Sequence, residues 1–404
     1  MNEKKQLSTE ELNEIFVIAC ENQQKGEFDL ARRGYVELLS WFSDAPVLHY
    51  NLGLVYFEMG NFQEATATFA KGVELAPLDV DLLFNLALSR RKCGDIAGAI
   101  DGYKKVLAQQ PDSADALYNL GGCFKDVKEN QSAITVYQQV LNIDPDHGAA
   151  HNNIAYMYQL EGNIDKAVCH FRKVVEINPD HQAAAHMLAA LTGEPVTSSP
   201  ESYVVEVFEN YSERYEESLV DELEYHVPAK IKAIVDGLDL WKNNFTRGLD
   251  LGCGTGLSGE PFSTIVTSLD GVDLSPKMVE IARQKKIYQT LVAGNMLQFV
   301  EGSKEMYDFF LAADVFAYLG DLEETFCVIK QHAAVDALFC FSTEHYGGEG
   351  FILQETGRFA HSIKYVEELC GHSGWKIQYR ESATLRKEKD SWIKGDLWFL
   401  APVI

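Results

Sequence analysis

Apolar side chains in the first half of the chain recur with a period of 34 residues. In each copy an alanine precedes an aromatic residue by four positions, which places both on one face of a helix. The pairs are Ala31 with Tyr35, Ala65 with Phe69, Ala99 with Tyr103, Ala133 with Tyr137, and Ala167 with Phe171. Prolines cannot continue a helix, and they follow on the same period at Pro77, Pro111, Pro145 and Pro179. The pattern therefore predicts a repeated pair of helices.

The helix that precedes each of these predicted helices carries a small residue where the two cross, at Gly53, Ala87, Gly121 and Ala155. Glycine also recurs on this period, at Gly26, Gly60, Gly94 and Gly162, where Lys128 is the one departure. A single helix pair cannot bury its apolar face alone, so the copies must stack continuously. We expect five repeats over about 12–181 and a capping helix near Gln182–Leu191.

This period and residue set resemble the tetratricopeptide repeat. The clearest copy runs through Asn51, Leu52, Gly53, Tyr56, Gly60, Ala65, Phe69, Gly72 and Pro77. The resemblance implies an all-α superhelix with a concave groove that binds a protein or peptide.

An asparagine recurs just before the repeated leucine or isoleucine, at Asn51, Asn85, Asn119 and Asn153. At this spacing the four amides are expected to line the concave face, where they can hydrogen-bond the backbone of an extended peptide. The arrangement is similar to the asparagine ladder of O-linked N-acetylglucosamine transferase. The alternative is that these amides bond only within the array. Neighbouring candidates for the same face are Tyr50, Phe84, Tyr118, Asn152, Arg91, Lys92 and Lys125.

The pattern changes after a linker, Glu-Pro-Val-Thr-Ser-Ser-Pro at 194–200. Short apolar runs then occur at 247–251, 266–273, 288–293, 307–313, 337–343, 375–380 and 396–402. Amphipathic segments separate most of them, which predicts an α/β domain with a parallel sheet covered on both faces. The predicted organisation is a repeat array at 1–193, the linker, and an α/β domain at 201–404.

The first of these strands leads into Gly252-Cys253-Gly254-Thr255-Gly256, and Asp250 precedes the loop. The second strand ends at Asp273. Leu257 stands where a nicotinamide-binding GxGxxG loop needs its third glycine, which disfavours a nicotinamide reductase. This combination resembles the class I methyltransferase signature over about 225–404. The resemblance implies a Rossmann-like fold and S-adenosyl-L-methionine as cofactor.

The family pattern also implies roles for individual residues. Asp273 would accept the ribose hydroxyls, and Asp250 would order the loop and the ammonium end of the cofactor. Asn295 stands where many relatives carry an aspartate, and its amide carbonyl can accept a bond from the adenine amino group. The remaining cofactor-binding candidates are Gly252, Cys253, Gly254, Gly256, Leu274, Met278, Met296, Ala312, Asp314, Tyr211 and Tyr215.

The aromatic segment 203–215 resembles the N-terminal helices that fold over the cofactor in small-molecule methyltransferases of the biotin and quinone pathways. Tyr203, Phe208, Tyr211 and Tyr215 recur there. Aromatic faces stabilise a sulfonium cation and exclude water. The alternative is a helix packed on the sheet or on the repeats.

Polar residues after the fifth strand are the candidates for contact with the methyl acceptor, because ligands of such sheets lie beyond the carboxyl ends of the strands. They lie in Glu344–Gly348 and Glu355–Ser362, which include His345, Arg358 and His361, and are joined by Arg386 further along the chain. Either histidine can act as a general base if the acceptor arrives protonated, or can serve as a helix cap or a solvated loop residue. The stretches around Arg358 and Arg386 resemble those of bacterial repeat-containing predicted methyltransferases.

The composition limits the kinds of partner and site that we expect. The net charge of −25 makes nucleic acid a poor candidate, since an acidic surface repels phosphates. The eight cysteines form no CxxC pair, so neither a metal site nor a disulfide framework is expected. The N-terminus has no apolar segment and no long apolar run follows, which predicts a cytoplasmic protein without a membrane span. The oligomeric state stays open.

Two functions remain at this point. In the first, the repeats recruit a peptide or protein substrate, or a partner, for an active methyltransferase. In the second, the repeats serve only protein assembly, and the catalytic half methylates a small molecule or acts as a cofactor-binding module.

Overall fold

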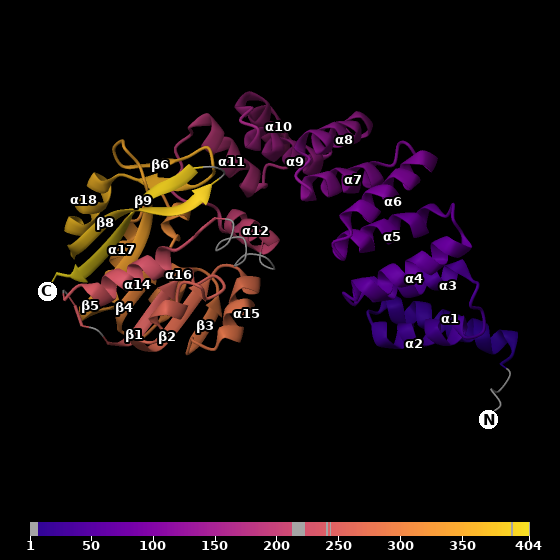
Figure 1. Cartoon of the computed structure of the whole chain (residues 1–404), viewed down its shortest axis with the longest axis horizontal. Coiled ribbons are helices and arrows are strands. Elements are labelled where there is room, and N and C mark those ends of the chain that lie inside the picture. The colour runs from indigo at the N-terminus through magenta and orange to yellow at the C-terminus, as the bar shows by residue number, and fades with distance from the viewer. Residues whose placement is uncertain (1–6, 212–222, 240, 243, 389–390, 404) are drawn as a thin grey trace. The chain divides into compact units, whose positions relative to one another are not determined.

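The computed structural model describes residues 7–211, 223–239, 241–242, 244–388 and 391–403. Contacts between Cα atoms divide the chain into two compact units, Met1–Asn178 and Pro179–Ile404. Figure 1 labels most helices and strands of the two units. In the described part of the chain, no helix is both long and apolar enough to cross a membrane.

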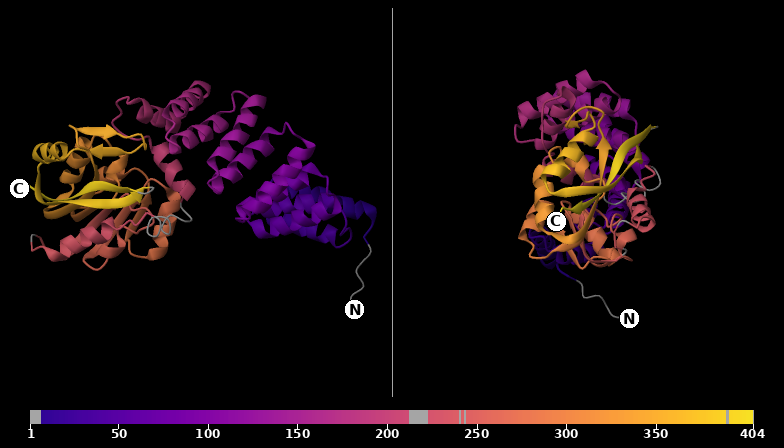
Figure 2. Two further views of the ribbon diagram at one scale, coloured as in Figure 1. Left: turned by 45° about the horizontal axis from the view of Figure 1, so that its top comes forward. Right: turned by 90° about the vertical axis from the view of Figure 1, so that its left-hand side faces the viewer.

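In the described residues of the first unit, ten helices form five consecutive pairs (Figures 1 and 2). They are α1 (Thr9–Gln24), α2 (Phe28–Leu39), α3 (Pro46–Glu58), α4 (Phe62–Leu75), α5 (Val80–Lys92), α6 (Ile96–Gln109), α7 (Ala114–Asp126), α8 (Asn130–Ile143), α9 (Gly148–Leu160) and α10 (Ile164–Ile177). The aromatic residue of every alanine–aromatic pair is buried, from Tyr35 to Phe171. The all-α repeat array expected from the sequence is therefore confirmed.

Close packing explains two of the small residues. A Cβ atom at Gly53 would lie 2.5 Å from a ring carbon of Phe69, and one at Gly121 would lie 2.7 Å from a ring carbon of Tyr137. A larger residue at either position would push the paired helices apart, because protein interiors are close-packed. The buried aromatic residue and the facing glycine thus form one packing unit.

The described strands of the second unit form a nine-stranded sheet. They are β1 (Phe245–Leu251), β2 (Val266–Asp273), β3 (Thr290–Ala293), β4 (Tyr307–Ala312), β5 (Ala333–His345), β6 (Phe351–Leu353), β7 (Phe359–His361), β8 (Trp375–Glu388) and β9 (Ser391–Pro402). The order β3-β2-β1-β4-β5 is parallel. The antiparallel pair β9–β8 continues from β5, and β7 and β6 extend the carboxyl end of β5. This is the Rossmann-like α/β arrangement that the sequence predicts.

All seven predicted strands are present, but two features differ from the predicted parallel sheet. Strands β8 and β9 are antiparallel, because the two residues between them are too few for the crossover that parallel neighbours require. The hairpin β6–β7 occupies a stretch in which the sequence predicts no strand. Its strands have only three residues each, too few to show a periodic pattern.

The sheet is covered on both faces. The described helices of this unit are α11 (Gln182–Thr192), α12 (Glu201–Tyr211), α14 (Val227–Gly237), α15 (Pro276–Lys285), α16 (Met296–Gly302), α17 (Glu323–Gln331) and α18 (Ile363–His372). Phe310 of β4 belongs to a core that includes residues of α17 and α18, whereas Phe309 belongs to a second core with α14. Alternation along a strand places such neighbours on opposite faces.

Helix α11 continues the 34-residue pattern, yet its contacts group it with the second unit. Ala189 and Ala190 pack with Leu353 and Phe359 of the β6–β7 hairpin. His186 of the same helix is buried, and its Nε2 lies 2.9 Å from the carbonyl oxygen of Gly357. The last helix of the repeat pattern is thus part of the hydrophobic structure of the α/β unit.

Replacing Lys128 by Gly is expected to stabilise the chain. Lys128 has φ +61°, at the turn position where the other copies have glycine with φ from +75° to +83°. The left-handed conformation strains an L-residue, so the variant K128G should raise the free energy of unfolding by about 1 kcal/mol. Urea denaturation followed by circular dichroism measures the change.

The matched control is Gly94→Lys, whose added Cβ atom would meet nothing within 4 Å. It isolates backbone strain and should lower the free energy of unfolding by a similar amount. If K128G is unchanged or less stable, backbone strain at this turn is not significant.

Candidate functional site

The turn after β1 is built by glycines and by one carboxylate. Gly252 and Gly254 have φ of +67° and +52°, which favours glycine at both positions. The backbone N–H of Gly254 donates to Asp273 Oδ2 at 2.9 Å, and that of Ser275 donates to Oδ1 at 2.8 Å. Asp273, at the tip of β2, therefore ties the first loop to the start of α15.

Asp250 lies below this loop and is fully buried. Its Oδ2 accepts hydrogen bonds from Ser258 Oγ and from the Tyr288 hydroxyl, both at 2.7 Å. Burial raises the pKa of Asp250 to about 7, against the opposing effect of these two hydrogen bonds. Its Oδ1 has no partner among the described residues. Asp250 thus holds the loop from beneath.

A cavity of about 700 Å³ opens at the carboxyl ends of β1, β2, β3 and β4. Backbone forms part of its wall, since a Cβ atom at Gly254 or Gly294 would meet nothing within 4 Å. The described residues that line it from these strand ends are Gly252, Gly254, Val272, Asp273, Leu274, Gly294, Asn295, Met296, Leu297, Ala313, Asp314 and Val315. Val204, Phe208, Tyr225 and Tyr318 add further walls. No lysine or arginine is among the described lining residues.

Seven of the cofactor-binding candidates from the sequence line this cavity. They are Gly252, Gly254, Asp273, Leu274, Asn295, Met296 and Asp314. Asp250, Cys253, Gly256, Met278 and Ala312 are not among the lining residues. Tyr211 ends α12, but its side chain lies outside the described part of the chain, and so does all of Tyr215.

Asn295 is already engaged by the protein. Its Oδ1 caps α16 by accepting from the N–H groups of Leu297 and Gln298, at 2.8 and 3.2 Å. Its Nδ2 donates to Glu201 Oε1 at 2.7 Å. The two acceptor positions of the amide oxygen are therefore occupied, and Glu201 presents a carboxylate in the same wall.

The two candidate histidines lie outside the cavity lining. His361 is buried, with Nε2 3.0 Å from the carbonyl oxygen of Gly320, and burial lowers its pKa to about 4. His345 pairs through Nδ1 with Asp396 Oδ2 at 2.9 Å. Both histidines thus make contacts within the fold.

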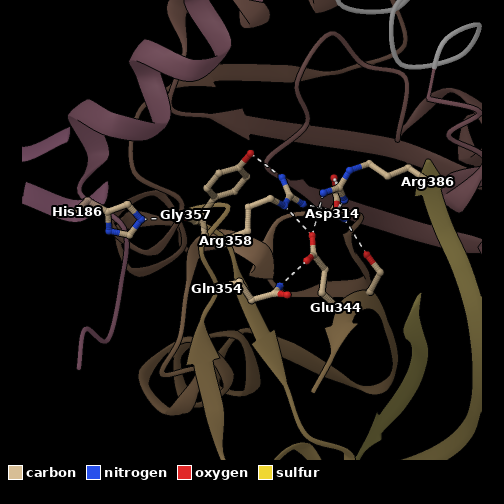
Figure 3. A network of polar contacts seen from close by, with 9 residues as sticks. His186, Asp314, Glu344, Gln354, Gly357, Arg358 and Arg386 are labelled. Atoms are coloured by element: carbon tan, nitrogen blue, oxygen red, sulfur yellow. Dashed lines mark hydrogen bonds and ion pairs between the residues drawn. The ribbon is translucent and has the colours of Figure 1, made fainter. Parts of the chain in front are cut away.

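Behind the cavity, two arginines and two carboxylates form a network in which Glu344 and Arg386 are buried and Arg358 and Asp314 are half-buried (Figure 3). Arg358 donates through Nε to Glu344 Oε1 at 2.6 Å and through Nη2 to Asp314 Oδ1 at 2.8 Å. Arg386 donates to the same two oxygens, at 2.9 and 3.1 Å. Burial raises the pKa of Glu344, but the two guanidinium groups outweigh it and lower the pKa to about 2. The sequence places Glu344 and both arginines among the acceptor candidates, but it does not predict that they pair, because they lie on distant segments.

Asp314 connects this network to the cavity. It has φ +63°, a left-handed conformation that is uncommon for a residue other than glycine. Its N–H donates to Ser342 Oγ at 2.8 Å, and its carboxylate accepts from both arginines. Backbone strain of this kind persists where surrounding contacts impose it, and such positions cluster at functional sites.

Comparison with protein families agrees with this geometry. A model described as "Methyltransferase domain" matches residues 249–341. Models of the tetratricopeptide repeat match residues 46–79, 92–152 and 126–191. The chain carries tetratricopeptide repeats followed by a methyltransferase domain.

Individual relatives match parts of the chain. Malonyl-[acyl-carrier protein] O-methyltransferase of Bacillus anthracis is 27% identical over 116 residues, which are 27% of this chain and 40% of that protein. The match thus spans about two fifths of the curated relative. A crystal structure of MamA protein is 26% identical, covers 42% of this chain and 92% of its own, and has a TM-score of 0.40. YrrB, described as "a TPR protein with an unusual peptide-binding site", is 24% identical, with coverage of 43% and 89% and a TM-score of 0.39.

The recurring asparagines of the tetratricopeptide repeats are half-buried, and three of them have partners within the array. Asn85 and Asn119 donate through Nδ2 to the backbone carbonyl one turn earlier, at Asp81 and Asp115. Asn153 donates to the Tyr118 hydroxyl at 3.2 Å. An amide oxygen has two lone pairs, so these contacts leave accepting capacity on Asn85 and Asn119. The internal bonds and a bound peptide are therefore compatible.

Titration of Asp250 is expected to make the stability of the methyltransferase domain depend on pH. Because its pKa is raised to about 7, the native chain binds this proton more tightly than the unfolded chain. The free energy of unfolding should therefore fall as the pH rises toward 7 and become level above it. In D250N this contribution is absent, so the variant should gain about 2 to 3 kcal/mol relative to the wild type between about pH 5 and 8.

Urea denaturation across that pH range measures the difference. Asp336→Asn is the control, because Asp336 is an exposed carboxylate paired with Lys242. Wild-type and D250N curves that stay parallel would contradict the assignment of a buried, titrating Asp250.

Proposed function

We propose that the methyltransferase domain binds S-adenosyl-L-methionine in the 700 Å³ cavity and methylates an acceptor that the tetratricopeptide repeats recruit. The observation that carries the cofactor is the loop held by Asp273. Gly252 and Gly254 offer bare backbone to the cavity, and Asp273 lies in the same wall. The family whose model matches here is generally dependent on this cofactor.

The residues present fit this ligand. Each Asp273 oxygen accepts one backbone N–H, which leaves lone pairs for the two ribose hydroxyls. The carboxylates of Glu201, Asp273 and Asp314 line the cavity, and a negative wall favours a cationic ligand. When bound, the sulfonium supplies an activated methyl group. The protein's contribution is to hold the two reactants in line and to exclude water.

Phe208 and Val204 of α12 support a lid over the cofactor, because both line the cavity from the segment that the sequence analysis proposed as an aromatic cover. Tyr203 of the same helix packs against a different residue. It is buried against His186, with ring centroids 4.5 Å apart. Helix α12 therefore forms part of the cavity wall and also packs on α11.

For the repeats, we propose that the amides of Asn51, Asn85, Asn119 and Asn153 contact the backbone of a protein substrate. The 34-residue spacing presents one amide in each of four repeats, and a backbone contact recognises an extended chain without selecting its side chains. Tetratricopeptide repeats imply interaction with protein. The amide oxygens of Asn85 and Asn119 are the groups best suited to accept from peptide N–H groups.

Binding of the cofactor is tested by calorimetry with S-adenosylmethionine, S-adenosylhomocysteine and NAD. We expect the first two to bind and NAD not to bind. Asp273→Asn keeps the size of the side chain but loses its charge, so it should weaken both affinities at least about tenfold. Asp336→Asn is the control and should bind as the wild type does. Unchanged affinity in D273N, or binding of NAD alone, would overturn the cofactor assignment.

Recruitment by the repeats is tested in the full chain by replacing the four asparagines together with alanine. With tritium-labelled S-adenosylmethionine and a cell extract, we expect labelling of protein to fall by about tenfold or more if each amide contributes about 0.5 kcal/mol. Affinity for S-adenosylhomocysteine should not change. Labelled products that are only small molecules, or protein labelling equal to that of the wild type, would favour assembly as the role of the repeats.

A further inference from the structure

Tyr318 is a cavity residue that neither the glycine motif nor the cofactor pattern identifies. It ends a short helical turn, Phe316–Tyr318, directly after Asp314 and Val315. Its side chain lines the cavity, and the ring of Phe208 meets it edge-on with centroids 5.5 Å apart. Tyr318 thus lies in the cavity wall between the carboxyl end of β4 and helix α12.

The hydroxyl of Tyr318 is held by Arg358. The guanidinium Nη1 donates to the hydroxyl oxygen at 2.8 Å, and the same group lies over the ring, 4.9 Å from its centroid. A guanidinium has donors and no acceptor. The hydroxyl oxygen therefore accepts in this contact, and its own proton must point elsewhere.

Arg358 itself is fixed on three sides. Glu344 accepts from its Nε and Asp314 from its Nη2. On the backbone side, the carbonyl of Gly357 lies 2.9 Å from Nε2 of the buried His186 of α11 (Figure 3). These contacts hold the guanidinium in place. The hydrogen bond that it donates therefore fixes the orientation of the Tyr318 hydroxyl.

The chemistry of this hydroxyl is that of a donor. Among the described residues, the Tyr318 hydroxyl donates to none, and the side chain borders the cavity. Burial raises the pKa of Tyr318, although the two arginines oppose the shift. The phenol therefore keeps its proton at neutral pH, and it can donate a hydrogen bond but does not serve as a base.

We propose that Tyr318 contacts the methyl acceptor by donating its hydroxyl proton to an acceptor oxygen, with Arg358 as the positioning residue. This inference rests on the proposed function. It assigns an acceptor that carries an oxygen lone pair beside the methylated atom and no proton on that atom, as a carboxylate does. A lone pair of the acceptor forms the new bond to the methyl carbon, and the electrons of the broken carbon–sulfur bond stay on sulfur. Tyr318 retains its proton throughout, so it orients the acceptor and transfers nothing.

Tyr318→Phe tests this contact, because it keeps the ring against Phe208 and removes only the hydroxyl. With tritium-labelled S-adenosylmethionine and a cell extract as the source of acceptors, we expect the initial rate of transfer to fall about 10- to 100-fold. Affinity for S-adenosylhomocysteine should stay within about twofold. Tyr379→Phe is the matched control, since its hydroxyl donates to Glu381 on an exposed part of β8.

Arg358→Lys tests the positioning role. Lysine keeps the charge but lacks the planar fork, so R358K should also slow transfer. If Arg358 acts through Tyr318, the double variant should be no slower than the slower single variant, whereas independent effects would multiply. If Arg358 has only a structural role, R358K should lower the midpoint of thermal unfolding. The double variant should then transfer methyl groups more slowly than either single variant.

The outcomes separate the two proposals. A Y318F variant that transfers as fast as the wild type overturns the role of Tyr318 and leaves the proposed function standing. Loss of S-adenosylhomocysteine affinity in Y318F assigns the residue to the cofactor and also overturns the inference. A wild-type chain that binds the cofactor but transfers no label overturns both proposals.

Discussion

The carboxylate of Asp273 is the constraint on which the site depends. It accepts one backbone N–H from the loop after β1 and one from the start of α15. Parallel strands β1 and β2 end side by side, so a single carboxylate at the tip of β2 can hold both turns. Glycine is needed at 252 and 254 because the loop must adopt left-handed conformations beside that carboxylate. The cavity wall follows from this arrangement.

The second constraint is electrostatic. Two arginines and two carboxylates, of which Glu344 and Arg386 are buried, meet behind the cavity, where either pair alone would leave charge without compensation. Their mutual hydrogen bonds engage both guanidinium groups and keep Glu344 ionised. This network holds Asp314 in its left-handed conformation and fixes the oxygen of Tyr318. The charged groups of this network therefore fix the positions of Asp314 and Tyr318.

Helix α11 shows how one segment can satisfy two patterns. Its alanines keep the spacing of the tetratricopeptide repeats, which is a local property of the sequence. Its packing partners are Leu353 and Phe359, more than 150 residues further along the chain. The hydrophobic contact therefore determines the unit to which it belongs, and His186 extends that contact to the backbone beside Arg358.

The sequence by itself determined the repeat array, the α/β class and the glycine loop, because each depends on residues close together in the chain. The period of 34 residues and the spacing from Asp250 to Asp273 are of this kind. Only the tertiary structure decided which candidates meet at the cavity. In it, His361 is buried in the core and Asn295 caps a helix. Tyr318 contacts Arg358, which lies 40 positions further along the chain. These outcomes depend on burial and on hydrogen bonds between distant segments, and no local pattern encodes them.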